Sequence, residues 1–223
     1  MTGAVTGGGT TGHSEKSEDA VPEWLRKLAA AASRMDSGPL TLPPDGGGTP
    51  SAVLILFGDG PDLLLIQRSD GLRLHPGQPA FPGGAIDAGD AGPAAAALRE
   101  AVEETGLDPA GVEVLGTLPE LFISRTGFRV VPVLAWWRRP SAVAPVDAAE
   151  VAAVERVRIS ELADPAARVM VRTPGGYLSP AFRVRGLLVW GFTAGLVDRL
   201  LALGGWERPW DTETVVDAPL RSR

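Results

Sequence analysis

The sequence predicts an α/β protein in which a mixed β-sheet lies between helices. Several short apolar segments are bounded by glycine and proline, as strands are, and two longer segments have helical spacing of apolar residues. Strands and helices in mixed order favour such a layered architecture. The expected strands are 52–57, 63–67, 112–118, 129–136, 151–158 and 182–190, and the expected helices are 94–105 and 192–203.

Glycine and proline set the limits of these elements. Residues 52–57 end at a turn containing Gly and Pro, so 63–67 is expected to return as the next strand. In the central helix, Pro93 stands at the start and Gly106 directly follows the last residue, as helix ends prefer. The helix at 192–203 carries leucines along one side.

A chain of 223 residues is long enough for one domain with terminal extensions. We expect a flexible N-terminal extension at 1–48, a folded domain at 49–205 and a C-terminal tail at 206–223. Residues 1–20 are rich in Gly, Thr and Ser, which is typical of disorder. Within the extension, 22–35 is expected to be a helix because Pro and Glu occupy its first turn.

The composition excludes several classes of protein. A net charge of -6 argues against general nucleic-acid binding. Cysteine is absent and histidine occurs twice, so thiolate and multi-histidine metal sites are disfavoured, and oxygen ligands for Mg²⁺ or Mn²⁺ remain. The first residues lack the features of a signal peptide, and no apolar run is long enough to span a bilayer. We therefore expect a cytoplasmic protein with no membrane association.

A glycine turn followed by a glutamate-rich helix is the most informative segment. Residues 81–84 are Phe-Pro-Gly-Gly, and Arg99 precedes Glu100, Glu103 and Glu104. Glu100 and Glu104 project from one side of the helix, with Glu103 beside them. Arg99 can form an ion pair with Glu103, four positions away. Carboxylates so close together repel one another unless a positive charge lies among them, which favours a divalent metal.

The turn adds a reason to expect phosphate chemistry. Gly83 and Gly84 carry no Cβ and let the backbone approach a ligand or metal. A cation held there would neutralise diphosphate oxygens and lower the pKa of an attacking water. Acidic residues at helical spacing are usually a solvated surface, and a Gly-Gly pair is usually only a turn. Here Phe-Pro-Gly-Gly, Arg-Glu, Glu-Glu and Gly-Leu occur in order, so coincidence is the lesser explanation.

This order of residues resembles the signature box of the Nudix hydrolases, which cleave diphosphates linked to another moiety. The resemblance implies a Nudix-type α/β/α sandwich and metal-dependent hydrolysis. Asp90 departs from the general pattern, because it stands where that pattern has a glutamate and lies one residue farther from Arg99. The extra residue is expected to bulge the loop, so Asp90 is either a loop aspartate or a functional residue.

A narrower resemblance concerns the residues before the box. Residues 64–69 are Leu-Leu-Ile-Gln-Arg-Ser, and Arg73 and Gly77 precede Phe-Pro-Gly-Gly. This is similar to the additional signature of the coenzyme A diphosphatase branch of the Nudix superfamily, with Ile66 where threonine is common. The resemblance covers roughly residues 50–203. It implies hydrolysis of coenzyme A to 4′-phosphopantetheine and adenosine 3′,5′-bisphosphate.

Such a substrate needs cations for its diphosphate and its 3′-phosphate. Arg68, Arg73 and His75 lie in the segment that leads to Gly83, and arginine suits phosphate through its planar fork. We expect these four residues to contact substrate. Alternatively, Arg68 or Arg73 pairs with a box carboxylate and His75 is only a loop histidine. Phe81 is expected in the core.

The expected mechanism assigns metal binding and proton transfer to different carboxylates. Glu100 and Glu104 are expected to hold Mg²⁺ or Mn²⁺. Glu103 and the Gly84 carbonyl are expected nearby. Glu150 is the expected general base, because the resemblance places a loop carboxylate at this position. Glu103 is the alternative base, and a solvated loop glutamate is the alternative role of Glu150.

Three functions remain open. The first is a metal-dependent diphosphatase acting on coenzyme A or its thioesters. The second is a Nudix hydrolase for another nucleoside diphosphate derivative, such as ADP-ribose or NADH. The third is a non-catalytic Nudix-like ligand-binding module, which is disfavoured because Glu100, Glu103 and Glu104 are all retained. The expected partner is a small molecule, and a homodimer is compatible with each function.

Overall fold

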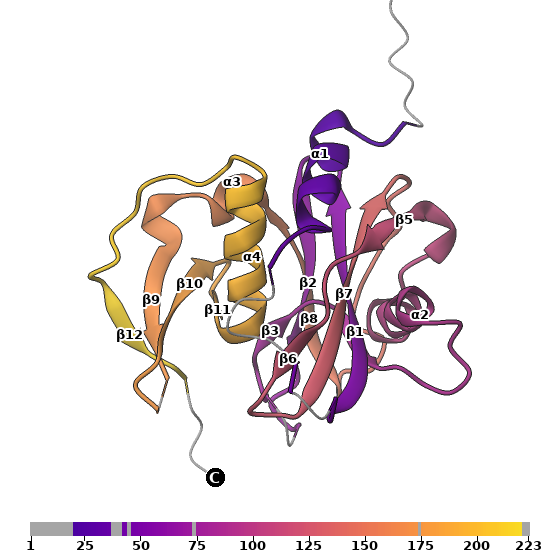
Figure 1. Ribbon diagram of the computed structural model, residues 1–223, viewed down its shortest axis with the longest axis horizontal. Helices are drawn as coiled ribbons and strands as arrows, with labels where there is room; N and C mark the ends of the chain where they lie inside the picture. Colours follow the sequence, from indigo (N-terminus) through magenta and orange to yellow (C-terminus); the bar gives the residue numbers. More distant parts are fainter. Residues whose placement is uncertain (1–19, 37–41, 44–45, 73–74, 174, 220–223) are drawn as a thin grey trace, which may run out of the picture.

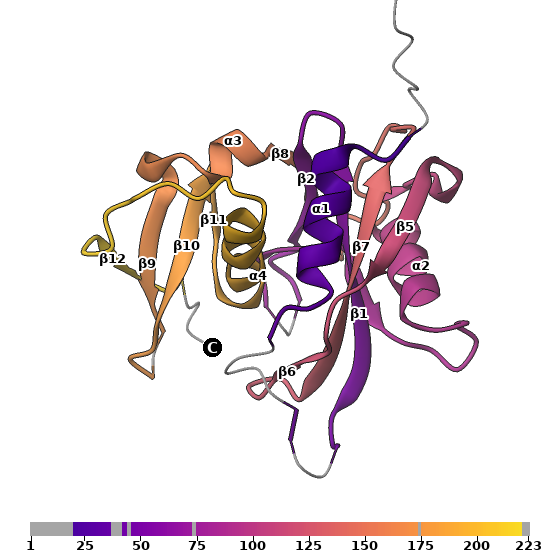
Figure 2. The same ribbon diagram turned by 45° about the horizontal axis from the view of Figure 1, so that its top comes forward.

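The computed structural model of the chain describes residues 20–36, 42–43, 46–72, 75–173 and 175–219. Its helices are α1 (Glu23–Ala32), α2 (Pro93–Thr105), α3 (Ile159–Leu162) and α4 (Gly191–Leu203). Figures 1 and 2 show α1 and α4 on one side of a large mixed sheet and α2 on the other. The predicted α/β/α arrangement is therefore confirmed.

The large sheet, called sheet A, has eight strands. They are β1 (Thr49–Gly58), β2 (Asp62–Arg68), β3 (Pro79–Ala80), β4 (Gly83–Ala85), β5 (Val112–Thr117), β6 (Leu121–Ile123), β7 (Phe128–Trp137) and β8 (Val151–Arg158). The central order is β3-β2-β1-β7-β5, with β4 beside β1, β6 beside β7 and β8 beside β2. β1 and β7 pair in parallel, whereas β1 pairs with β2 and β4 in antiparallel fashion.

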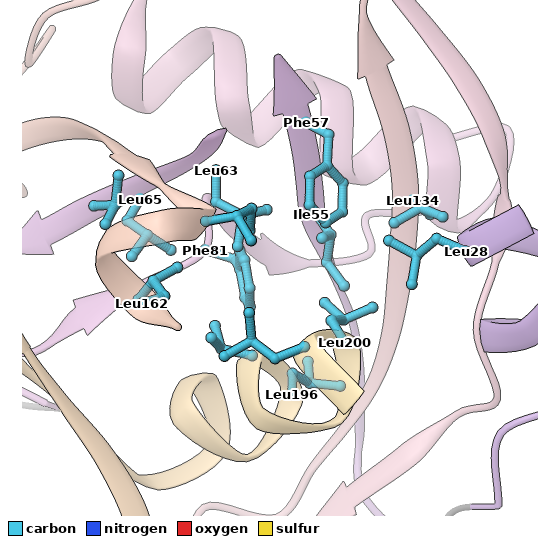
Figure 3. Packing of buried hydrophobic residues seen from close by; sticks show 14 of the residues in the cluster. Leu28, Ile55, Phe57, Leu63, Leu65, Phe81, Leu134, Leu162, Leu196 and Leu200 are labelled. Atoms are coloured by element: carbon cyan, nitrogen blue, oxygen red, sulfur yellow. The ribbon is translucent and has the colours of Figure 1, made fainter. Parts of the chain in front are cut away.

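Side chains alternate along β1 and form one hydrophobic cluster on each face of sheet A. Ile55 and Phe57 pack with leucines of α1 and α4, as Figure 3 shows. Leu54 and Leu56 pack with the alanines of α2. Phe81 is 3% exposed in the first cluster, so its predicted place in the core is confirmed. Each such burial stabilises the fold by about 1.5–3 kcal/mol before the cost of ordering the chain.

A second sheet, called sheet B, was not predicted. It has the order β11-β10-β9-β12 and is formed by β9 (Arg168–Arg172), β10 (Leu178–Val184), β11 (Leu187–Val189) and β12 (Val215–Asp217). The single strand predicted at 182–190 is wrong, because β10 and β11 form a hairpin. Arg185 and Gly186 form its turn, with φ values of 52° and 76°. A two-residue turn with positive φ at both positions reverses the chain tightly.

Segments from both ends of the chain pack on the core. Leu25 and Leu28 of α1 are buried. The Trp24 ring lies 5.5 Å from that of Phe57 and 5.4 Å from that of Trp206, both centroid to centroid. The limits of extension, domain and tail drawn from the sequence stay a prediction. None of the described helices is long and apolar enough to cross a membrane.

Candidate active site

Alanines bring α2, which carries the acidic box, close to sheet A. The helix begins at Pro93, and Gly106 after its last residue has a left-handed φ of 68°, which favours glycine. Ala96, Ala97 and Ala101 are buried in the cluster between α2 and sheet A. The short side chains allow a close approach, so the glutamates on the adjoining side of α2 lie beside β4.

Gly83 and Gly84 of β4 contact two of these glutamates. The Gly83 N–H donates a hydrogen bond to Oε2 of Glu104 at 3.0 Å. A Cβ added at Gly84 would lie 2.7 Å from Oε2 of Glu100. At Gly83 an added Cβ would collide with the backbone of β1. Gly83 therefore requires glycine, whereas a side chain at position 84 would displace the carboxylate of Glu100.

Glu104 is a buried carboxyl group with 7% of its surface exposed. Its pKa is raised to about 7, chiefly by burial and to a smaller extent by the negative charges of Glu100 and Glu150. The Gly83 N–H and the positive charge of Arg68 act in the opposite direction. A buried carboxyl group near two other carboxylates is a favourable place for a cation.

Arg99 contacts most of the other carboxylates of the box. Its Nε and Nη2 donate to the two carboxylate oxygens of Asp90 at 3.1 and 3.0 Å. Its Nη1 donates to Glu100 at 2.9 Å and to Glu103 at 3.1 Å. Nη2 also donates to the Ala85 carbonyl at 3.0 Å. Burial raises the pKa of Glu100 in spite of the Arg99 ion pair. Arg99 thus orders the box but leaves it with excess negative charge.

Asp90 is the bidentate partner of Arg99. The Arg99 hydrogen bond, together with one from the Asp87 N–H at 2.8 Å, holds the pKa of Asp90 below its usual range. Asp87 itself lies 3.6 Å from Arg99. The sequence contains no local signal for either contact, because the loop before α2 folds back on the helix. Of the two sequence interpretations, the structure places Asp90 in the network of the box.

One of the expected phosphate-binding residues lies at the end of β2. Arg68 is the last residue of β2, where the pairing with β8 shifts register. Its Nε atom is buried and has no hydrogen-bond partner among the described residues. The described ion pairs of the box carboxylates all involve Arg99, not Arg68. Arg73 lies outside the described residues.

His75 belongs to a small basic group. Its φ is 54°, and its Nδ1 lies 2.9 Å from Oε1 of Gln78. Burial lowers the pKa of His75 against the effect of the Gln78 hydrogen bond, and the positive charges of Arg68 and Arg125 lower it further. Arg125, in the turn between β6 and β7, was not recognised from the sequence because only tertiary structure brings it near His75.

Glu150 lies exposed in the turn before β8. Its carbonyl accepts a hydrogen bond from the N–H of Ser69, directly after β2, at 2.8 Å. Its negative charge acts on Glu104. The turn therefore brings Glu150 to the same edge of sheet A as Arg68 and the box.

Among the described residues, no group of three or more His, Asp and Glu side chains is arranged as a ready metal site. Arg99 lies among Asp90, Glu100 and Glu103 instead. Glu100 and Glu104 nevertheless supply oxygen donors beside β4, which suit Mg²⁺ or Mn²⁺. Burial raises the pKa of both, so a cation would favour charges that the protein compensates only in part. These residues fit a divalent ion.

Comparisons with known proteins point in one direction. The model of the NUDIX domain family matches residues 48–174, more than half of the chain. A protein of Enterobacter sp. (strain 638), named "Uncharacterized Nudix hydrolase NudL", is 42% identical over 159 residues, which cover 67% of this chain and 80% of that protein. The protein of the same name from Citrobacter koseri is 60% identical over 74 residues, 33% of this chain.

The Citrobacter alignment covers 38% of that relative, so this match spans well under half of its length. Among solved structures, a Nudix hydrolase from M. smegmatis, RenU, aligns with a TM-score of 0.48 and 22% identity. That alignment covers 74% of this chain and 89% of the other.

Proposed function

This chain belongs to the Nudix hydrolase family, and we propose that it hydrolyses the diphosphate bond of coenzyme A or its derivatives. Water adds across the P–O–P bond, and the products are 4′-phosphopantetheine and adenosine 3′,5′-bisphosphate. The family supports the broader class of nucleoside diphosphate derivatives. The choice of coenzyme A rests on the order of residues at 64–69, Arg73 and Gly77 before the Phe-Pro-Gly-Gly turn.

One observation carries the catalytic part of the proposal. Glu104 and Glu100 lie against the backbone of Gly83 and Gly84, buried enough that their pKa values are raised. A protein that used these glutamates only for solubility would leave them in solvent. Their burial beside a glycine turn supports a role in binding a cation and the phosphates that accompany it.

We assign Glu100 and Glu104 to a Mg²⁺ or Mn²⁺ ion, with Glu103 and the Gly84 carbonyl nearby. Nudix hydrolases generally use divalent metal ions. The bound ion supplies charge neutralisation of the diphosphate and a lowered pKa of the attacking water. Arg99 keeps Glu100 and Glu103 in place through hydrogen bonds of 2.9 and 3.1 Å, which limits their rotamers before substrate binds.

The remaining roles follow from position. The buried Nε of Arg68 is a donor without a partner in the described part of the chain, so a phosphate oxygen can satisfy it. Arg73, His75 and the turn at Gly83 are assigned to the same substrate. Glu150 is assigned as the general base that accepts the proton of the attacking water. Glu103 is the weaker candidate because it already pairs with Arg99.

Product analysis tests the proposal. The protein is incubated with Mg²⁺ or Mn²⁺ and with coenzyme A, acetyl-coenzyme A, coenzyme A disulfide, ADP-ribose or NADH. We expect the highest kcat/KM for coenzyme A or one of its derivatives, with adenosine 3′,5′-bisphosphate as the nucleotide product of the free coenzyme. Faster turnover of ADP-ribose or NADH would favour the alternative substrate class. Binding without turnover of any compound would favour a ligand-binding module.

The expected partner is thus a small molecule. A homodimer and a cytoplasmic location remain predictions. Light scattering of the purified protein would decide the first, and fractionation of cells the second.

A further inference from the structure

The segment between β7 and β8 is bonded to the helix that carries the box. The N–H of Ala144 donates to the Thr105 carbonyl at 3.0 Å, and the N–H of Val146 donates to the Glu104 carbonyl at 3.3 Å. Carbonyl groups in the last turn of a helix have no partner within the helix. The segment satisfies two of them, and one belongs to a proposed metal ligand.

Asp147 organises the turn that follows. Its Oδ1 accepts a hydrogen bond from the Ala149 N–H at 2.8 Å. Its carbonyl accepts from the N–H groups of Glu150 at 3.0 Å and Val151 at 2.9 Å. An aspartate that bonds the backbone two residues further on stabilises a tight turn. Asp147 therefore accepts hydrogen bonds from three consecutive N–H groups, those of Ala149, Glu150 and Val151.

The far end of the turn is bonded to β2. The Glu150 carbonyl accepts from the Ser69 N–H at 2.8 Å, and Val151 pairs with Arg68 in sheet A. The backbone of Glu150 is thus held between the C-terminal end of α2 and the end of β2. Its carboxylate remains exposed and acts electrostatically on Glu104.

We propose that Asp147 is the positioning residue for Glu150. This role rests on the proposed function, in which Glu150 accepts a proton from the attacking water. A general base must lie within hydrogen-bond reach of the proton that it takes, and a small displacement is costly. Asp147 contacts no reacting atom in this scheme. It acts through the backbone that presents Glu150.

Two substitutions distinguish the hydrogen-bond acceptor of Asp147 from its negative charge. Asp147→Ala removes the Oδ1 acceptor, and kcat with coenzyme A and Mg²⁺ is expected to fall by about 10–100-fold while KM changes by less than about threefold. Asp147→Asn keeps Oδ1 and is expected to remain within about threefold of the wild type. Asp164→Ala is the matched control, because Asp164 accepts from the Ala166 N–H at 3.0 Å in the same way outside the site. Its kcat should not change.

Two further readouts test that Asp147 acts through Glu150. In a Glu150→Gln background, Asp147→Ala should cause no additional loss of kcat, because both changes remove the same function. In the metal-free protein, amide hydrogen exchange at Ser69 and Val151 should become faster in Asp147→Ala and stay unchanged in Asp147→Asn.

The outcomes are distinct. Wild-type kcat in Asp147→Ala, an equal loss in Asp147→Asn, or a full multiplicative loss in the double variant would each overturn the positioning role. An active wild type in those experiments leaves the proposed function standing. A wild type inactive on every diphosphate tested would reject the proposed function and this role with it.

Discussion

Two arginines, Arg99 in α2 and Arg168 in β9, show how the box and sheet B differ. The Arg99 side chain is 28% exposed and lies within ion-pair distance of four carboxylates. The Arg168 side chain is 1% exposed and pairs with one carboxylate, that of Asp198 in α4. Several carboxylates around one cation leave negative charge for a second cation. A single buried pair leaves none, so it serves packing.

The surroundings of Arg168 support this contrast. Its guanidinium lies 4.3 Å from the ring of Trp210 and 5.1 Å from that of Phe182. Nε and Nη1 are buried and have no hydrogen-bond partner within the described ranges, as expected beside aromatic faces. Trp210 precedes β12, which pairs with β9. Arg168 therefore binds the C-terminal segment to sheet B, whereas Arg99 of the box lies among several carboxylates.

The contrast predicts its largest effect at Glu104. Glu104→Gln should lower kcat/KM by about 1,000-fold or more, equivalent to about 4 kcal/mol of transition-state stabilisation. Its far-UV circular dichroism should match the wild type, because an amide fills the same volume and keeps an oxygen for the Gly83 N–H. Metal-dependent turnover of coenzyme A measures the effect. A fully active variant would reject the assignment of Glu104.

Arg168→Ala should lower the stability of the fold, whereas Glu104→Gln lowers turnover. It leaves Asp198 without its partner and removes the ring contacts, so the free energy of unfolding should fall by about 3 kcal/mol. The matched control is Arg172→Ala in the same strand, because its Asp217 pair is exposed and 3.6 Å long. That change should cost less than about 0.5 kcal/mol. Urea unfolding measures both, and equal losses would contradict the distinction.

In the metal-free protein, Glu104→Gln should stabilise the fold at high pH. The pKa of Glu104 is raised from 4.5 to about 7 in the folded state. The contribution of protonated Glu104 to the free energy of unfolding is therefore fully present below pH 4.5. It is lost as the pH rises through 7, because the buried carboxyl must then ionise. The amide avoids this loss, so the variant should exceed the wild type by about 2–3 kcal/mol at pH 8 and match it near pH 4.

Thermal unfolding in EDTA at the two pH values measures this difference. Glu103→Gln is the control, since its side chain is 57% exposed, and it should show no comparable pH-dependent gain. The same pH dependence in the wild type and in Glu104→Gln would refute the burial argument. Added Mg²⁺ should restore the wild type at pH 8 and leave the amide variant largely unaffected.

The smallest effect is expected at Trp210. Trp210→Ala removes one ring from Arg168 but leaves the Asp198 pair, so the free energy of unfolding should fall by about 1–2 kcal/mol. Turnover per folded molecule should stay at the wild-type value, because Trp210 packs on Arg168 of sheet B and does not contact the box. Urea unfolding and turnover of coenzyme A, measured on one sample, test both expectations. Lost turnover without lost stability would show that sheet B takes part in catalysis.

Elements with local signals could be predicted from the sequence. Pro93 and Gly106 mark the ends of α2, and the apolar runs of β1, β2 and β7 have strand composition. The glutamate spacing predicted that Glu100 and Glu104 lie on one side of α2, and the contacts with β4 agree with it. These features depend on neighbours within a few residues of the chain, so they can be predicted from the sequence.

Contacts across the fold could not be predicted. The short strands β9 and β12 have little pattern of their own, and β12 forms only where β9 offers a parallel edge. The left-handed turn at Arg185 looked like the interior of a strand. Asp90 meets Arg99, and Arg125 approaches His75, only because loops return to the same edge of sheet A.

The sequence by itself determined the candidate chemistry, because a glycine turn and three glutamates at helical spacing offer several carboxylate oxygens close together wherever the helix lies. Only the tertiary structure decided which glutamate is buried and which is exposed. α2 rests on sheet A through alanines, so Glu104 turns toward β4 and loses solvent, whereas Glu103 turns outward to Arg99. Desolvation depends on every element that surrounds a group, and spacing along the chain does not encode it.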